Sequence, residues 1–244
     1  MDRLSGKVAI ITGAAQGMGE AHVRLFVEQG AKVVMTDLNE EKGNALAAEL
    51  GENVLFVKQD VSSEEGWETV IAKTEETFGP VNVLVNNAGI TMAKNIFDIT
   101  LEDYRRIVDI NQVSVFLGTK AAAASMMKVG GGSIVNISSM NGLVAGAVAY
   151  TDTKFAVRGM TKAAAINLAP MGIRVNSVHP GVIATPMVMQ EDTRAAVEEF
   201  SKHIPLKRVA QPEEVSNMVL FLASDESSYS TGSEFVIDGG MTAQ

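Results

Sequence analysis

The sequence predicts an α/β fold, a single-domain doubly wound (Rossmann-like) parallel sheet of about seven strands with helices on both faces. Seven short runs rich in β-branched residues recur along the 244 residues, and each is apolar at successive positions rather than at alternate ones. That pattern is typical of strands covered on both faces. Helical patterns lie between the runs, and strand alternating with helix indicates a parallel sheet. Because no repeat, low-complexity tract or flexible linker interrupts the chain, residues 1–244 are expected to form one domain.

The individual elements follow from the same patterns. The strands are expected at residues 7–12, 32–37, 53–60, 82–89, 133–138, 173–178 and 234–238. Helices are expected where apolar residues recur at helical spacing, as in the faces formed by Met18, Ala21, Leu25 and Phe26, by Leu101, Tyr104, Ile107 and Val108, and by Val215, Met218, Val219 and Leu222. Residues 183–211 are too long for a plain connection, so we expect a partly helical substrate lid or a binding loop there.

Composition narrows the classes of function. The 20 basic and 29 acidic residues give a net charge of −9, which would repel a phosphate backbone, so nucleic acid is not an expected partner. His22, His179 and His203 lie far apart and outside any HExxH spacing, so a histidine-based catalytic metal site is not expected. Without cysteine, a signal-peptide pattern or an apolar run near ~20 residues, the chain is expected to be cytoplasmic, with no membrane partner.

A glycine-rich turn directly follows the first predicted strand. The stretch "TGAAQGMGEA" contains Gly13, Gly17 and Gly19, a GxxxGxG spacing that differs from the common GxGxxG fingerprint. Glycines at such a turn let the backbone approach a pyrophosphate, and the following helix directs its first N–H groups at the anion. The turn therefore predicts a dinucleotide site, although a glycine turn can also be purely structural.

An acidic residue stands at the end of the second predicted strand. Asp37 comes 18 residues after Gly19, where a carboxylate accepts hydrogen bonds from the ribose hydroxyls of an adenosine. It would also repel the 2′-phosphate of NADP. Leu38 and Asn39 follow it, and residues 14–18 contain no Arg or Lys to offset its charge. NAD is therefore the expected cofactor, while capping of the next helix is an alternative role for Asp37.

A phenol and an ammonium are expected on one helical face within "YTDTK". Tyr150 and Lys154 are four residues apart, which makes them neighbours on a helix. An adjacent ammonium favours phenolate and should lower the tyrosine pKa from about 10 toward neutrality. Tyr150 would then be a usable proton donor and acceptor. The alternative is an ordinary solvated helix face.

These motifs together resemble one known family. The segments "TGAAQGMG", "NNAG", "NISS", "YTDTK" and "HPG", with Asn111, are similar in content and order to those of the short-chain dehydrogenase/reductase family and span the whole chain. The stretches "VHPGVIATP" and "TGSEFVIDGGMTAQ" most resemble those of bacterial secondary-alcohol dehydrogenases and carbonyl reductases.

The resemblance implies roles for the catalytic residues. Tyr150 would be the general acid/base, and Lys154 would lower its pKa and hold the nicotinamide ribose. Ser139 would polarise the substrate carbonyl, with the adjacent Ser138 as a rival, because the segment before Tyr150 is about two residues shorter than in many relatives. Asn111 would hold a water in the proton relay to Lys154.

The resemblance also implies which residues contact ligands. The cofactor, NAD, would be bound by Gly13, Gln16, Gly17, Met18, Gly19, Asp37, Leu38, Asp60, Val61, Asn87, Ala88, Gly89, Tyr150, Lys154, Pro180, Gly181, Val182, Ile183 and Thr185. An apolar substrate wall is expected from Ile90, Met92, Leu143, Val144, Met187 and Met189, although the two lid methionines could simply pack the lid. His179 is expected to have a structural role beside Pro180.

The expected function is NAD(H)-dependent interconversion of a secondary alcohol and a ketone. Reduction of an acyl-carrier-protein-linked ketone (3-oxoacyl-carrier-protein reductase) is an alternative, but "MMKVGGGS" offers only Lys128 for docking such a carrier. A hydroxysteroid or polyol dehydrogenase stays open, as does a non-catalytic module on the same fold. By resemblance we expect a homotetramer and a structural Mg²⁺ at the C-terminal carboxylate of Gln244, with an ordered metal-free terminus as the alternative.

Overall fold

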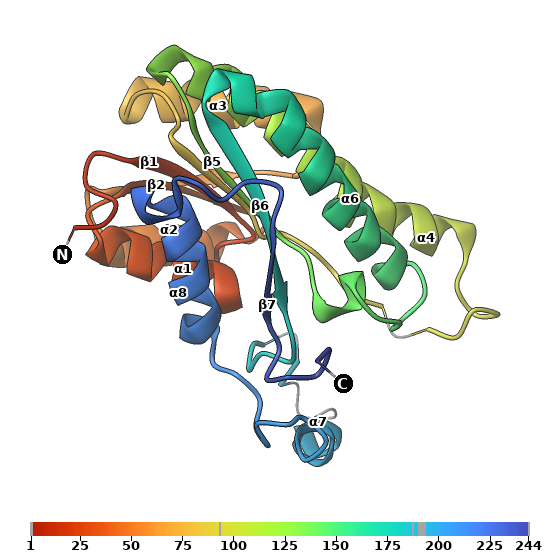
Figure 1. The fold of residues 1–244 in the computed structure, drawn as a ribbon. Helices are drawn as coiled ribbons and strands as arrows, with labels where there is room; N and C mark the ends of the chain where they lie inside the picture. Colours follow the sequence, from red (N-terminus) through yellow and green to blue (C-terminus); the bar gives the residue numbers. More distant parts are fainter. Residues whose placement is uncertain (1, 93, 187, 190–193, 244) are drawn as a thin grey trace.

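Seven parallel strands form one sheet within the residues that the computed structural model describes, which are 2–92, 94–186, 188–189 and 194–243 (Figure 1). The strands are β1 (Val8–Thr12), β2 (Lys32–Asp37), β3 (Val54–Lys58), β4 (Val83–Asn86), β5 (Gly132–Ile137), β6 (Ile173–Pro180) and β7 (Glu234–Ile237). Their order across the sheet is β3-β2-β1-β4-β5-β6-β7, and every neighbouring pair is parallel. The fold class expected from the sequence is confirmed.

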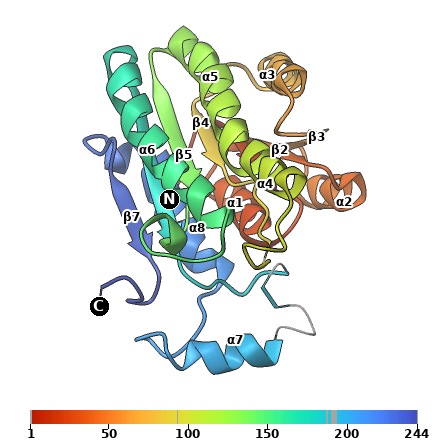
Figure 2. The ribbon, with the colours of Figure 1, turned by 90° about the vertical axis from the view of Figure 1, so that its right-hand side faces the viewer.

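Helices cover both faces of this sheet (Figures 1 and 2). One face carries α1 (Gly17–Glu28), α2 (Glu40–Leu50) and α8 (Pro212–Ala223). The other face carries α3 (Glu64–Thr77), α5 (Ser114–Met126) and α6 (Tyr150–Leu168). Two further helices, α4 (Leu101–Val108) and α7 (Arg194–Ser201), lie before α5 and within the segment 183–211.

Short polar side chains define where several helices begin. The side chain of Asn39 accepts a hydrogen bond from the backbone at the start of α2, and Ser63 does the same for α3. Thr100 and Asp103 form a reciprocal capping box at the start of α4. Since Asn39 is the cap of α2, Asp37 does not have the capping role that was one alternative for it.

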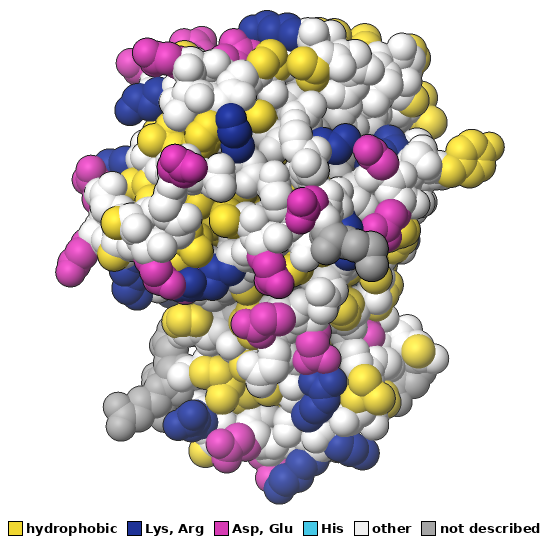
Figure 3. Space-filling view, turned by 90° about the vertical axis from the view of Figure 1, so that its left-hand side faces the viewer, with side chains coloured by type: hydrophobic (Ala, Val, Ile, Leu, Met, Phe, Trp, Pro, Cys, Tyr) yellow, Lys and Arg dark blue, Asp and Glu magenta, His cyan; other side chains and the backbone are white. Residues whose placement is uncertain are grey.

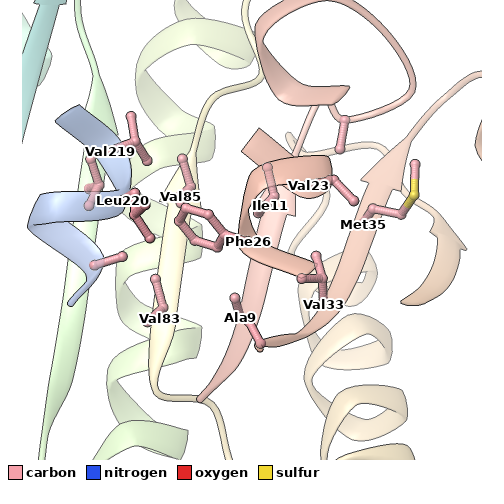
Figure 4. Packing of buried hydrophobic residues seen from close by; sticks show 14 of the residues in the cluster. Ala9, Ile11, Val23, Phe26, Val33, Met35, Val83, Val85, Val219 and Leu220 are labelled. Atoms are coloured by element: carbon pink, nitrogen blue, oxygen red, sulfur yellow. The ribbon is translucent and has the colours of Figure 1, made fainter. Parts of the chain in front are cut away.

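Alternate residues of each central strand pack against opposite helical layers, which explains their continuous apolar runs. In β1, Ile11 packs with α1 and α8, whereas Ile10 packs with α3 and α5. Figure 4 shows Phe26 of α1 and Leu220 of α8 among the buried side chains on the same face of the sheet as Ile11. Phe26 and Trp67 of α3 are fully buried, and burial of each such side chain contributes about 1.5–3 kcal/mol.

The third and fourth strands end earlier than the sequence predicted. β3 ends at Lys58 and β4 at Asn86, whereas strands were expected to reach residues 60 and 89. The residues in between leave the sheet as loops at its carboxyl edge. The chain order reverses there between β1 and β4, and ligands of doubly wound sheets bind beside such a reversal.

The segment 183–211 is partly helical, as predicted. Its two ends are tied together, because Ile183 and Ala210 form a parallel bridge and the Ala184 N–H donates to the Ala210 carbonyl at 2.8 Å. Between them, α7 lies apart from the sheet and has no buried residue among those described (Figure 2). Its role as a substrate lid stays a prediction.

The surface view agrees with an acidic chain of mixed charge. Figure 3 shows acidic and basic side chains interspersed on one face of the molecule, without a large basic area on that face. In the described part of the chain, no helix combines the length and the apolar character needed to cross a membrane.

Candidate active site

A cavity of about 1130 Å³ opens at the carboxyl ends of the strands that flank the reversal. Most of the residues predicted to bind the cofactor line it. They are Gly13, Gln16, Gly17, Met18, Gly19, Asp37, Leu38, Asp60, Val61, Asn87, Ala88, Gly89 and Thr185, and Ile90 of the predicted substrate wall lines it as well. Sequence segments that are far apart therefore meet around one space.

Glycine is sterically required at two positions of the turn beneath this cavity. A Cβ on Gly19 would lie 2.2 Å from the carbonyl oxygen of Gly13. Gly13 has a φ of +62°, and a Cβ there would lie 2.8 Å from the Cα of Ala88. At the start of α1 the side chain of Gln16 makes no capping hydrogen bond, so N–H groups of its first turn face the cavity unused. This arrangement suits an anion such as a pyrophosphate.

The Asp37 carboxylate is held by the backbone on both sides. One oxygen accepts a hydrogen bond from the Ala15 N–H at 3.1 Å, and the other accepts from the Asn39 N–H at 3.0 Å. The sequence indicated no cation near residues 14–18, but Lys42 of α2 reaches that loop, where its Nζ donates to the Gln16 Oε1 at 2.8 Å. The Lys42 ammonium thus lies at the edge of the cavity near Asp37, although it comes from a different segment of the chain. The sequence around residues 14–18 could not reveal this contact.

Unpaired polar atoms in the cavity wall indicate what kind of ligand it fits. Both side-chain polar atoms of Gln59 and the Oδ1 of Asn87 are buried without a hydrogen-bond partner among the described residues, and both residues line the cavity. Such atoms are costly unless a ligand or water satisfies them. Together with the glycine turn and Asp37, they fit the polar groups of a nicotinamide dinucleotide.

Tyr150 and Lys154 lie on consecutive turns at the start of α6. Tyr150 is the first residue of the helix, and the Lys154 Nζ lies 5.5 Å from the centre of its ring. Ala149 just before it has a φ of 67° and a ψ of −47°, and the Tyr150 N–H donates to the Val148 carbonyl at 2.9 Å. This is a γ-turn of the rare, strained kind. The strain, of order 1–3 kcal/mol, fixes the direction from which Tyr150 enters the site.

Burial controls the proton affinity of both groups. Burial raises the pKa of Tyr150, and the Ser139 side chain opposes that rise. Burial lowers the pKa of Lys154 to about 8, and its ammonium donates to the Ile137 carbonyl at 2.9 Å. The net shift of the Tyr150 pKa is upward, opposite to the expected fall toward neutrality, because desolvation, which the sequence does not show, sets its direction. The effect of the Lys154 charge on Tyr150 stays a prediction.

The two adjacent serines after β5 point to different partners. The Ser138 hydroxyl donates to the Lys154 carbonyl at 2.9 Å and is committed to the backbone of α6. The Ser139 Oγ accepts from the Asn141 N–H at 3.1 Å, so its own hydrogen is available for an oxygen in the site. Of the two serines, only Ser139 acts on the pKa of Tyr150, which it lowers. The geometry favours Ser139 over Ser138 as the residue that touches a substrate.

Asn111 connects the catalytic groups to the wall of the cavity. It lies fully buried in a π-helical turn (Asp109–Val113) between α4 and α5, a feature that is frequent at functional sites. Its Oδ1 accepts from the Ile90 N–H at 2.8 Å, and its Nδ2 donates to the Ile90 carbonyl at 2.9 Å. A Cβ on Gly89 would lie 3.3 Å from the Asn111 Oδ1 and 3.6 Å from the Lys154 Nζ. Gly89, which lines the cavity, thus lies next to both Asn111 and Lys154.

Other predicted contacts lie around this centre rather than in the cavity wall. Gly181 and Val182 follow β6 and line a separate cavity of about 70 Å³, and the neighbouring Pro180 and Ile183 are buried. Leu143 and Val144 lie on the loop after Ser139, with Val144 42% exposed. Met92 and Met189 are half-buried on other loops. Met187 and Gln244 lie outside the described residues, so their predicted substrate and metal roles stay predictions.

Sequence reasoning missed several residues of the cavity wall, including all those from α4 and the turn after it. The missed residues come from the loop after β3, from the region of α4 and from the segment after β6, and they are Gln59, Ser62, Leu101, Glu102, Arg105, Arg106, Asp109, Ile110 and Pro186. The capping box at Thr100 marked the start of α4 in the sequence. Nothing local indicated that this helix would face the glycine turn.

Comparisons with known proteins agree with this geometry. A family model described as enoyl-(acyl carrier protein) reductase matches residues 13–242. The chain is 51% identical over 244 residues to a 3-alpha-(or 20-beta)-hydroxysteroid dehydrogenase of Mycobacterium tuberculosis, covering 99% of this chain and 91% of that protein. It is 47% identical over 253 residues to a cyclopentanol dehydrogenase of Comamonas testosteroni, covering 100% of both.

Two further matches extend these findings. An NADP-dependent (R)-specific alcohol dehydrogenase of Lentilactobacillus kefiri is 44% identical over 252 residues, covering 100% of this chain and 99% of that protein. A crystal structure of a short-chain type dehydrogenase/reductase from Mycobacterium marinum superimposes with a TM-score of 0.94 at 37% identity, covering 99% of this chain and 97% of that one.

Proposed function

Because the chain belongs to the short-chain dehydrogenase/reductase family, we propose that it is an NAD(H)-dependent oxidoreductase that interconverts a secondary alcohol and a ketone. The observation that carries this proposal is the placement of Tyr150 at the start of α6 with the Nζ of the buried Lys154 5.5 Å from the centre of its ring, beside a Ser139 hydroxyl whose hydrogen is uncommitted. Ser139, Tyr150 and Lys154 form a set of polar hydrogen donors, and Lys154 lies next to Gly89 in the wall of a cavity that fits a dinucleotide. Such a set suits proton transfer to and from a substrate oxygen.

The cofactor would be held by the turn and the strand ends. The glycine turn and the first N–H groups of α1 would bind its pyrophosphate, Asp37 its adenosine ribose, and Lys154 its nicotinamide ribose. When bound, it supplies or accepts the hydride. The protein orients the reacting groups and moves the proton.

Tyr150 is the proton-transfer residue in this proposal. In ketone reduction its hydroxyl protonates the carbonyl oxygen, and in alcohol oxidation its phenolate takes the hydroxyl proton. The Ser139 Oγ–H donates to the same substrate oxygen and stabilises the negative charge that develops there. With its pKa near 8, Lys154 is largely cationic at neutral pH and favours the phenolate once Tyr150 loses its proton. Asn111, locked onto the Ile90 backbone, would hold a water on the path toward Lys154.

Preference for NAD follows from Asp37 at the ribose position. Its carboxylate would meet a 2′-phosphate with unfavourable charge, and Leu38 beside it is 63% exposed and offers no positive group. Lys42 acts in the opposite direction, since its Nζ lies on Gln16 at the same edge of the cavity. We infer that Asp37 dominates, because Lys42 is exposed and its charge is screened by solvent.

The proposed substrates are apolar secondary alcohols and their ketones, and cyclic ones are favoured. Ile90 lines the cavity, and the apolar residues Leu143 and Val144, on the loop after Ser139, and Met92, two residues after Ile90, would complete the substrate wall. The relatives named for cyclopentanol and hydroxysteroids favour ring substrates, and a hydroxysteroid substrate is the second candidate. Because the matching family model is described as an enoyl-(acyl carrier protein) reductase, a substrate linked to acyl carrier protein is included in the test.

A substrate and cofactor panel tests the proposal. Cyclopentanol, acyclic secondary alcohols, a hydroxysteroid, a polyol and an acyl-carrier-protein-linked ketone would be assayed with NAD(H) and with NADP(H). We expect the highest kcat/KM with NAD and cyclopentanol, and a lower kcat/KM with the acyclic secondary alcohols. No turnover of any alcohol or ketone with either cofactor would contradict the proposed reaction, and preference for the carrier-linked ketone would contradict the substrate class.

The remaining expectations concern assembly and environment. We propose a cytoplasmic homotetramer, and the exposed apolar side chains of Phe116, Phe155 and Ile166 on α5 and α6 give a surface suited to subunit contact. A structural Mg²⁺ at the C-terminal carboxylate also stays a proposal. Light scattering coupled to size exclusion, with and without EDTA, measures both properties. A monomer would contradict the first, and an unchanged assembly and melting temperature after verified metal removal would contradict the second.

A further inference from the structure

His179 on β6 is fully buried, and both of its ring nitrogens have partners. Its Nδ1 lies 2.9 Å from the Ser139 carbonyl oxygen, and its Nε2 lies 2.9 Å from the Ser177 Oγ. A carbonyl oxygen can only accept a hydrogen bond, so Nδ1 carries the proton. In a neutral ring Nε2 then accepts from the Ser177 hydroxyl, whose other acceptor, the Ser233 carbonyl, is more distant at 3.5 Å.

The surroundings keep this imidazole neutral and away from proton transfer. Burial lowers the pKa of His179 despite the opposing contributions of the Ser139 carbonyl and of Glu234 on β7, and Arg158 and Lys154 on α6 act in the same direction as burial. A neutral, fully buried ring has no access to a substrate oxygen. His179 is therefore no rival of Tyr150 as the acid/base.

The geometry of the sheet explains why a side chain is needed here. β5 and β6 are paired up to Ile137 and Val178, and the next bond of the ladder is the Ser138 N–H to the Val178 carbonyl at 2.8 Å. In a parallel ladder the Ser138 carbonyl would then accept from residue 180, but Pro180 has no N–H. The backbone ladder stops at the two serines, and the His179 side chain supplies the next bond, to the Ser139 carbonyl.

We propose that His179 is a positioning residue, which holds the Ser139 backbone through its Nδ1–H so that the Ser139 hydroxyl meets Tyr150 and the substrate oxygen. This inference rests on the proposed function. Ser139 has an extended backbone at the start of a short 3₁₀ turn, and its Oγ is already fixed by the Asn141 N–H. Movement of the Ser139 carbonyl would therefore move the donor that Tyr150 uses.

Three substitutions of His179 separate positioning from simple packing. The side-chain amide nitrogen of Asn matches Nδ1 in reach, whereas that of Gln matches Nε2 and Leu has no donor. His179→Gln and His179→Leu should lower kcat by of order 10²-fold, as expected for a misplaced catalytic group, with the KM for cofactor nearly unchanged. His179→Asn should retain kcat within a few-fold of the natural protein.

The pH profile gives a readout that a packing role would not move. The Ser139 hydroxyl opposes the rise in the Tyr150 pKa, so its displacement should shift the rising limb of kcat/KM for alcohol oxidation to higher pH. This shift is expected in His179→Gln and His179→Leu and not in His179→Asn. An Asn variant no better than Gln, or equal pH profiles in all three variants, would overturn the positioning role.

Nitrogen-15 NMR of labelled histidine tests the hydrogen bond without turnover. The resonances of His179, assigned by their loss in His179→Asn, should show a protonated Nδ1 and an unprotonated Nε2. An Nε2–H tautomer would overturn the inference even in an active enzyme. If the natural protein instead oxidises no alcohol although the Nδ1–H tautomer is present, the hydrogen bond stands, whereas the proposed function and the catalytic consequence drawn from it are both overturned.

Discussion

A buried histidine outside the active site makes stability depend on pH. His22 on α1 is fully buried against α8, where its Nδ1 lies 2.7 Å from the Ser216 Oγ. The Ser216 hydroxyl donates to the Pro212 carbonyl at 3.1 Å, so Nδ1 carries a proton and Nε2 does not. That Nε2 is buried and has no partner among the described residues. A second proton would place an uncompensated charge in the core.

The size of the effect follows from the pKa. Burial lowers the pKa of His22 from 6.5 to about 3, so the unfolded chain binds a proton more readily than the folded one between these values. The neutral histidine contributes its full share of stability above pH 6.5 and loses it as the pH falls toward 3. Between pH 7.5 and pH 5.0 the loss is about 2 kcal/mol, at about 1.36 kcal/mol for each pH unit below 6.5.

The measurement is urea unfolding at both pH values and one protein concentration, followed by fluorescence of the single tryptophan, Trp67, which is buried. His22→Gln and His22→Leu should reduce the loss of stability between pH 7.5 and 5.0 by about 2 kcal/mol relative to the natural protein. Burial also lowers the pKa of His179, so this second histidine adds to the pH dependence of stability. The test therefore compares the loss of stability in the natural protein with that in each His22 variant. His203→Gln, at an exposed site, is the control. Equal losses in the natural protein and both His22 variants would refute the reasoning.

Three further outcomes are expected around the site. Ser139→Ala should lower kcat by roughly 10²–10³-fold because it removes a donor to the substrate oxygen. Ser138→Ala should instead mainly lower the free energy of unfolding, by about 1 kcal/mol. Steady-state kinetics and thermal melting of both variants measure these effects, and an equal loss of kcat in the two variants would contradict the assignment. Asp37→Gly combined with Leu38→Arg should raise the NADPH/NADH ratio of kcat/KM roughly tenfold or more, and a ratio above one in the natural protein would contradict the role of Asp37. Gly19→Ala should cost about 1–3 kcal/mol and weaken cofactor binding, because its Cβ would lie 2.2 Å from a carbonyl oxygen; calorimetric titration showing normal affinity would contradict this.

Features with a local signature could be read from the sequence. The seven strands were recognisable because burial on both faces leaves a continuous apolar run, and the glycine turn because only glycine tolerates the contact between Gly19 and Gly13. Tyr150 and Lys154 were placed on one helical face by their spacing alone. The strand ends were less accurate, since the predicted strands were extended over residues 59–60 and 87–89, where the apolar run has already ended.

Features that depend on distant segments could not be read in this way. Lys42 reaches Gln16 from another helix, and α4 becomes a cavity wall through the way it packs. The direction of the Tyr150 pKa shift depends on burial, which the residues near Tyr150 in the sequence do not determine. The bond from His179 to Ser139 joins residues 40 positions apart, so the sequence showed a histidine beside a proline but not what it holds.

The central claim is that Tyr150 transfers the proton in a nicotinamide-dependent reaction, and Tyr150→Phe tests it most directly. The substitution keeps the ring packed against Lys154 and removes only the hydroxyl, so the fold and cofactor affinity should be preserved. The measurement is kcat for alcohol oxidation beside the cofactor Kd from calorimetric titration, with the fully exposed Tyr229→Phe as the control. The account predicts a fall in kcat of roughly 10²–10⁴-fold at nearly unchanged Kd, with the control at the natural rate. A Tyr150→Phe enzyme that retains kcat within about threefold, well below the contribution of a general acid/base, would contradict it.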